Sequence, residues 1–245
     1  MERKEFGTHV SASYNQYLED LFNLVLEMGG MVEKQLSSAL SAVQNADVAL
    51  AKEVIQLDKF INREEIEIDR LCSRVLARQQ PTASDLRLVI SAIRIGLDLE
   101  RMGDEVVKIA KLVVHLDKIG SDACLNLQGY KELIEISAHG MNMLKDVLNA
   151  FSRLDLPSCV AIIREEEQVD VIYKNAVVEV TERFKDSDSD IECLLELIYA
   201  LKASERITDH ACNIAEIIVY LVNGKELRNM DSERMAEMLV ELNRS

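Results

Sequence analysis

Two pairs of carboxylates, each spanning one helical turn, are the residues of this sequence best suited to chemistry. Glu100 and Asp104 form one pair, and Glu205 and Asp209 form the other, 105 residues further on. Residues four apart share one face of a helix, where two like charges repel by about 0.2–0.5 kcal/mol. A bound cation would remove that repulsion, so both pairs are candidate metal ligands.

A further polar pair precedes each of these. Asp58 and Asn62 are four apart in the first half, and Glu166 and Asp170 stand 108 residues later. Neighbouring helices of an antiparallel bundle lie side by side, so each polar pair can converge with the carboxylate pair that follows it. Oxygen ligands without Cys or His favour Mg²⁺, Mn²⁺ or iron over a closed structural zinc site. The sequence predicts one metal site in each half.

Ordinary surface chemistry is the alternative interpretation of these residues. Asp104 and Lys108 have the spacing of an i,i+4 ion pair, and Asn213 stands where a second such lysine would be. His210, beside Asp209, is either an additional nitrogen ligand or an exposed ion-pair partner. Spacing alone leaves these alternatives open.

The elements that carry the carboxylates repeat along the chain. Apolar residues alternate in steps of three and four from Ile95 to Leu116, and a similar stripe runs from Leu201 to Leu221. Such steps are typical of a bundle helix. Because the stripes match at a fixed offset, the sequence contains an internal repeat.

The repeat predicts an all-α fold of two tandem three-helix bundles, with residues 1–120 as the first unit and 121–245 as the second. Helices are expected over residues 12–45, 47–79, 83–118, 127–153, 156–186 and 189–224. Thr82, with Asp85 three residues later, resembles a capping box. Residues 230–245 have the pattern of a short amphipathic C-terminal helix.

Composition limits the possible partners. The formal net charge is −15, Trp is absent and aromatic residues make up 4%, which argues against nucleic acid. No run approaches the ~18 apolar residues of a membrane span, and no signal peptide precedes the first helix, so we expect a cytoplasmic protein without membrane insertion. The five scattered cysteines are expected to be reduced.

Several stretches of the sequence resemble the PhoU family of bacterial phosphate-uptake regulators. Glu100-Arg101-Met102-Gly103-Asp104 and Glu205-Arg206-Ile207-Thr208-Asp209 resemble its paired E-R-[IM]-[GT]-D signature. Residues 28–33 (MGGMVE) and 78–87 (RQQPTASDLR) are similar to that family as well. The resemblance covers nearly the whole chain.

The resemblance implies metal at E(D)-x-x-x-D motifs, with zinc added to iron and the lighter divalent ions. Two departures stand out: Asn62 is neutral where a carboxylate could stand, and Thr208 replaces the usual glycine. The neutral Asn62 is expected to make the first site the weaker one, and Thr208 is expected to crowd the approach of metal to its motif.

The family also implies a negative regulator of the phosphate-starvation response. Such a protein would be an adaptor, expected as a homodimer, between the ATPase subunit of a phosphate ABC transporter and the sensor histidine kinase of the phosphate regulon. The alternative is an enzyme, a carboxylate-bridged oxidase or phosphohydrolase. That alternative needs metals inside a bundle and an enclosed pocket, whereas these carboxylates lie just off the core stripe. We therefore expect no enzymatic activity.

Overall fold

The protein is built from long α-helices in two bundles. The computed structural model describes residues 12–120, 124–186 and 189–225, together with residues 233 and 237, and these contain six helices. The helices are α1 (Ala12–Asn45), α2 (Val48–Gln79), α3 (Ala83–Ile119), α4 (Gln128–Arg153), α5 (Leu156–Arg183) and α6 (Ile191–Asn223). The predicted class and helix ranges are confirmed to within a few residues. The helix predicted over residues 230–245 lies outside the described residues, apart from 233 and 237.

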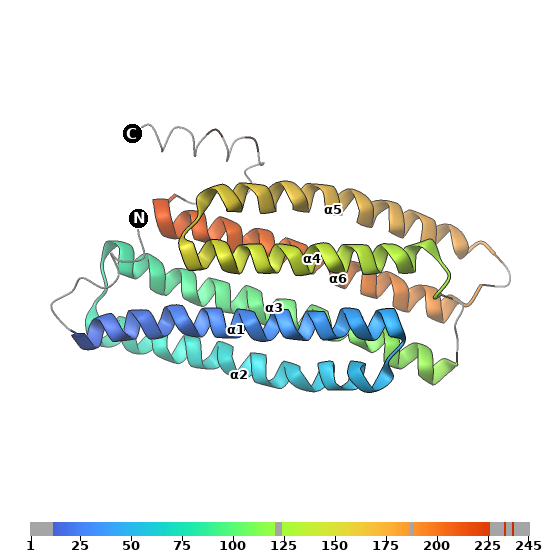
Figure 1. The fold of residues 1–245 in the computed structure, drawn as a ribbon, viewed down its shortest axis with the longest axis horizontal. Coiled ribbons are helices and arrows are strands. Elements are labelled where there is room, and N and C mark those ends of the chain that lie inside the picture. Colours follow the sequence, from blue (N-terminus) through green and yellow to red (C-terminus); the bar gives the residue numbers. More distant parts are fainter. Residues whose placement is uncertain (1–11, 121–123, 187–188, 226–232, 234–236, 238–245) are drawn as a thin grey trace.

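Helices α1–α3 form one bundle and α4–α6 form the other, and the two bundles lie side by side with their long axes aligned (Figure 1). Helices α3 and α6 run antiparallel along the boundary. Near one end Arg87 Nε donates to Leu221 O at 3.0 Å, and near the other His115 Nε2 lies 2.9 Å from Glu192 Oε1. The two helices that carry the carboxylate pairs are therefore direct neighbours.

The repeated apolar stripes form the core. Every stripe position from Ile95 to Leu116 and from Leu201 to Leu221 is buried, and a single hydrophobic core extends through both bundles. The Phe22 and Phe151 rings stack between α1 and α4 with their centroids 4.4 Å apart. A Cβ atom on Gly29 would lie 2.3 Å from Leu148, so this glycine permits the close approach of α1 to α4.

Short polar caps set several helix ends. Asp47 Oδ1 accepts from Leu50 N at 3.0 Å at the start of α2, and Asp190 Oδ1 accepts from Cys193 N at 3.1 Å at the start of α6. The predicted capping box at Thr82 is wrong, because its side chain makes no capping hydrogen bond. Its expected partner Asp85 instead accepts from the Tyr14 hydroxyl at 2.8 Å.

Cysteine chemistry also departs from the expectation. Cys124 and Cys193, whose Cα atoms are 6.0 Å apart, form a disulfide between the start of the second half and α6. Cys72, Cys159 and Cys212 are free thiols. The two cysteines are 69 residues apart in the sequence, and the fold brings them together. Their spacing is not a C-x-x-C motif, so the sequence did not predict the disulfide.

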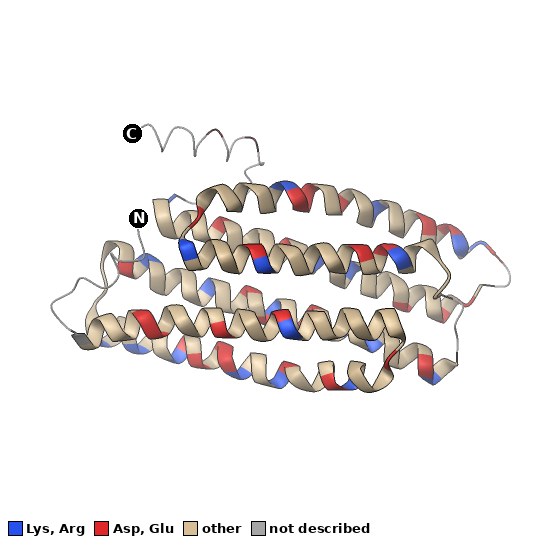
Figure 2. Ribbon diagram, viewed as in Figure 1, with Lys and Arg blue, Asp and Glu red and all other residues tan. Residues whose placement is uncertain are grey.

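Charged residues of both signs are interspersed along the described helices (Figure 2). Among these helices, acidic residues are therefore not confined to one end. Within the part of the chain that the structure describes, no helix is long and apolar enough to cross a membrane.

Candidate metal sites

The first candidate site lies where α2 runs beside α3. Asp58 and Asn62 face it from α2, with Asn62 Nδ2 donating to Asp58 Oδ2 at 3.4 Å, and Glu100 and Asp104 face it from α3. Burial, and then the negative charge of Asp104, raises the pKa of both Asp58 and Glu100. The structure therefore brings the four predicted residues into one electrostatic cluster.

A fifth oxygen donor, Glu65, belongs to the same cluster and was missed from the sequence. Burial and the charge of Asp69 raise the pKa of Glu65, and the charge of Glu65 in turn raises that of Glu100. Glu65 follows Asn62 by three residues, so the helical spacing of Asp58, Asn62 and Glu65 was the available signal.

The donor set of this first site fits a hard cation. Asp58 Oδ1 and Asn62 Oδ1 are both buried and have no hydrogen-bond donor. Buried acceptors are normally paired, so these two oxygens on one helix face are suited to accept a cation or an ordered water. A Cβ atom on Gly103 would lie 3.2 Å from Asp58 Oδ1, so the glycine leaves space beside that oxygen.

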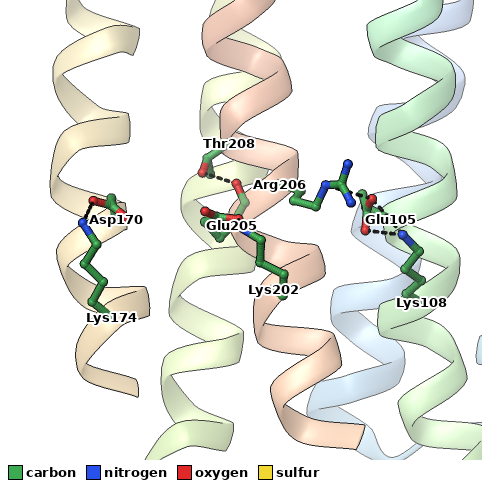
Figure 3. Close-up of polar contacts among 8 residues, drawn as sticks. All are labelled: Glu105, Lys108, Asp170, Lys174, Lys202, Glu205, Arg206 and Thr208. Carbon is green, nitrogen blue, oxygen red and sulfur yellow. Dashed lines mark hydrogen bonds and ion pairs between the residues drawn. The ribbon is translucent and has the colours of Figure 1, made fainter. Parts of the chain in front are cut away.

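The second candidate site lies between α5 and α6 and includes its own cations (Figure 3). Lys174 donates to Asp170 on α5, and Lys202 Nζ donates to Glu205 Oε2 at 2.5 Å on α6. Lys202 also lies 5.2 Å from the ring centroid of Tyr173, which occupies the place of Glu65 in this half. Two of the four predicted oxygen donors are therefore already paired with ammonium groups.

The remaining carboxylates of the second site repel each other. Burial, followed by the charges of Asp209 and Asp170, raises the pKa of Glu166 to about 7. Burial also raises the pKa of Glu205 and of Asp209, while the neighbouring Lys202 ammonium acts in the opposite direction on both. Near neutral pH, Glu166 therefore holds a proton for part of the time.

Thr208 makes the second site structurally different from the first. Its side chain is buried, and its Oγ1 donates to Glu205 O at 2.7 Å, so the hydroxyl is satisfied within α6 (Figure 3). Thr208 occupies the position that Gly103 holds in the first half. The side-chain atoms at this position fill space that the first site leaves open.

Two neighbouring residues pair differently from the expectation. Lys108 pairs with Glu105, at 2.8 Å, and not with Asp104. His210 is buried, contrary to the exposed position expected for it, and its Nδ1 lies 2.9 Å from Asp98 Oδ1 on α3. The Lys108–Glu105 pair has an i,i+3 spacing that the sequence also offered, whereas the His210–Asp98 pair depends on how α3 and α6 meet.

An ion pair also crosses the boundary between the halves near both sites. Arg206 Nε on α6 lies 3.3 Å from Glu105 Oε1 on α3, and Glu105 is buried (Figure 3). Glu105 follows Asp104 of the first site, and Arg206 follows Glu205 of the second. The two candidate sites are therefore connected through adjacent residues and one ion pair.

With the side chains as they lie, no group of three His, Cys, Asp or Glu residues in the described ranges is placed to enclose a metal ion. Both sites are clusters of facing oxygens on helix surfaces. A cation held there would complete its coordination with water, as Mg²⁺ commonly does.

The internal repeat of the chain corresponds to a known protein domain. The PhoU domain model matches residues 25–113 and again residues 133–218. The chain belongs to the PhoU family. Its two bundles are thus two PhoU repeats, each carrying one candidate site.

Individual PhoU proteins support this assignment over nearly the full length. The chain is 40% identical over 235 residues to a "Phosphate-specific transport system accessory protein PhoU homolog" of Pseudomonas putida, covering 96% of this chain and 90% of the relative. It is 37% identical to the PhoU accessory protein of Escherichia coli K12, covering 98% and 97%. The crystal structure of PhoU from Pseudomonas aeruginosa superposes with a TM-score of 0.81 at 40% identity, over 86% of this chain and 100% of that one.

Proposed function

We propose that this chain is a negative regulator of the phosphate-starvation response that works as an adaptor in the cytoplasm and not as an enzyme. It would connect the ATPase subunit of a phosphate ABC transporter with a sensor histidine kinase when phosphate is plentiful, as a homodimer. The observation that carries the proposal is its identity of about two residues in five, over almost the whole length, to accessory proteins of phosphate-specific transport systems.

Deletion of the gene tests this role. The phosphate-starvation genes are expected to be expressed in phosphate-rich medium once the protein is lost, measured with a reporter of that regulon in a strain without a second copy. Full repression in the deletion strain would contradict the proposal. A pull-down in phosphate-rich and phosphate-depleted medium, with identification of the captured proteins, separates an adaptor from a metalloenzyme.

The proposal includes divalent or iron ions (Mg, Mn, Fe or Zn) at the two carboxylate clusters. Support comes from the buried oxygens without donors at the first site and from the raised pKa values of Asp58, Glu100 and Glu166. The raised pKa values mean that negative charge is held there at a cost that a bound cation would lower, and the oxygens without donors have lone pairs that a cation would use.

Paired substitutions distinguish metal ligands from surface charge. Replacing Glu205 and Asp209 by Gln and Asn should abolish ion uptake by the second site, with Glu100→Gln and Asp104→Asn as the matched change in the first. A ligand at a hundredfold excess over its dissociation constant stabilises the folded state by about 2.7 kcal/mol. Each double variant should lose the stabilisation that comes from an ion at its own site. If wild type takes up no Mg²⁺, Mn²⁺ or Fe²⁺, the clusters are ordinary solvated surface.

A further inference from the structure

The first half contains a polar interior position that the second half lacks. Gln35 on α1 is fully buried, and its Oε1 has no hydrogen-bond donor. Its amide nitrogen donates to Val54 O at 3.4 Å. With Asp58 Oδ1 and Asn62 Oδ1, Gln35 Oε1 makes three buried oxygens without donors, contributed by α1 and α2.

Two of these oxygens, those of Asp58 and Gln35, lie beside the space that Gly103 leaves open on α3, and the Asn62 amide lies next to Asp58. A Cβ atom on Gly103 would lie 3.2 Å from Asp58 Oδ1 and 3.3 Å from Gln35 Oε1. Any other residue at this position would fill the gap between the two oxygens. All three helices of the first bundle therefore border one small oxygen-lined space just beneath the surface carboxylates.

The equivalent place in the second half has no such oxygens at its base. Met143 replaces Gln35 and is fully buried, and Thr208 replaces Gly103 with its hydroxyl bonded to its own helix. A thioether and a methyl group thus stand where the first half has an amide oxygen and a gap. A thioether is a poor ligand for hard cations.

The two sites also differ in how many of their carboxylates are paired with lysines, and this difference again favours a cation at the first site. Lys202 and Lys174 pair with carboxylates of the second site. Leu97 stands in the place of Lys202 in the first half. No described lysine or arginine forms an ion pair with Asp58, Glu65, Glu100 or Asp104, although the more distant Lys111 and Arg101 partly offset the burial that raises the pKa of Asp58 and Glu100, so the first site is less neutralised by its own cations than the second.

We propose that the first half holds a hard divalent cation at an inner position between α1, α2 and α3, ligated by Gln35 Oε1, Asp58 Oδ1 and Asn62 Oδ1, and that this position makes the first site the stronger of the two. One carboxylate and two amide oxygens match the oxygen ligands that Ca²⁺, Mg²⁺ and Mn²⁺ accept, with waters and the outer carboxylates completing the shell. The order of affinity is the reverse of that expected from the neutral Asn62. This inference rests on the proposed binding of metal at the first site.

Mn²⁺ binding to the full-length chain, followed by electron paramagnetic resonance and by the melting temperature with and without the ion, tests the inner position. Gln35→Met copies the second half, and we expect it to weaken Mn²⁺ binding at the first site about tenfold or more. Its metal-free melting temperature is measured alongside, because the change removes an oxygen without a donor but also the amide group that donates to Val54 O and hydrogen-bonds Asp58. Met143→Leu, the matched change in the second half, should leave Mn²⁺ affinity unchanged.

Gln35→Glu separates a ligand from a hydrogen-bond donor. If Gln35 is a ligand, the added charge retains or strengthens Mn²⁺ binding, and the ion raises the melting temperature more than in wild type. If its amide nitrogen instead supports Asp58, the variant is destabilised by two adjacent carboxylates and gains nothing from Mn²⁺, which overturns the inner position.

Two further outcomes would contradict the proposal, and they can be told apart. If Gln35→Met binds Mn²⁺ as wild type does while Glu100→Gln with Asp104→Asn abolishes binding, the ion sits only on the outer carboxylates and the inner position is wrong. If wild type binds no Mn²⁺, Mg²⁺ or Ca²⁺ at all, the proposed metal function fails together with it.

Discussion

Replacing Glu166 by glutamine should stabilise the metal-free protein at neutral and alkaline pH. Burial and the charges of Asp209 and Asp170 raise the pKa of Glu166 from 4.5 to about 7 in the folded protein. As the pH rises through this window, the unfolded chain releases the proton first, so the folded state loses stability progressively and stays at the lower level above it. The full difference corresponds to about 3.4 kcal/mol. Solvent screening of the partly exposed carboxyl reduces it to about 1–2 kcal/mol.

Thermal unfolding with a chelator present, at about pH 4.5 and about pH 8, measures this effect. For a protein of this size, 1–2 kcal/mol corresponds to a rise of about 2–8 °C in the melting temperature at the higher pH and much less at the lower one. Glu53→Gln, a change of the same kind at an exposed glutamate of the first bundle, is the control. An equal shift of the Glu166 variant at both pH values, or none at either, would refute the reasoning that repulsion within the second site sets this pKa.

Three further predictions concern the contact between the two halves, the disulfide within the second half and the independence of the first. Asp98→Ala should lower the stability by about 1–3 kcal/mol, because the buried His210 loses its partner, and an unchanged denaturation midpoint would show that the pair adds nothing. In denaturant without reductant, three of the five cysteines should react with a thiol reagent, whereas five reactive thiols would mean that Cys124 and Cys193 are not joined. The first unit, residues 1–120, is expected to fold alone with a helical circular dichroism spectrum, and an unfolded fragment would contradict its autonomy.

Much of the fold followed from patterns within single helices. Periodicity, the internal repeat and a few capping residues were sufficient to place all six helices, because each helix signals its buried face in its own sequence. The paired acids at Glu100 and Glu205 were found in the same way. Their companions on α2 and α5 followed from the topology of a helical hairpin.

What the sequence did not reveal depends on contacts between helices. Gln35 is separated from Asp58 by a turn and part of two helices, and nothing in the local pattern marks its oxygen as unpaired. The pairing of His210 with Asp98 requires the antiparallel register of α3 against α6. The ion pairs of Lys174 and Lys202 depend on side-chain conformations on crowded helix faces, where several partners lie within reach.

The charges along the α3–α6 boundary make the two halves complementary and not interchangeable. Glu105 and His210 occupy equivalent positions of the repeat, 105 residues apart, yet Glu105 meets Arg206 while His210 meets Asp98. If a second copy of the first half replaced the second half, Asp98 would face another Glu105, acid against acid.

Two copies of the second half would be mismatched as well. Ala203 is the equivalent of Asp98, so each His210 would lose its carboxylate, and Arg206 would face a second His210. Specificity of this kind arises from repulsion in the wrong pairing as well as attraction in the right one. The halves produced as separate chains should therefore assemble with each other in preference to themselves, so that an internal duplication behaves as a heterodimer on one polypeptide.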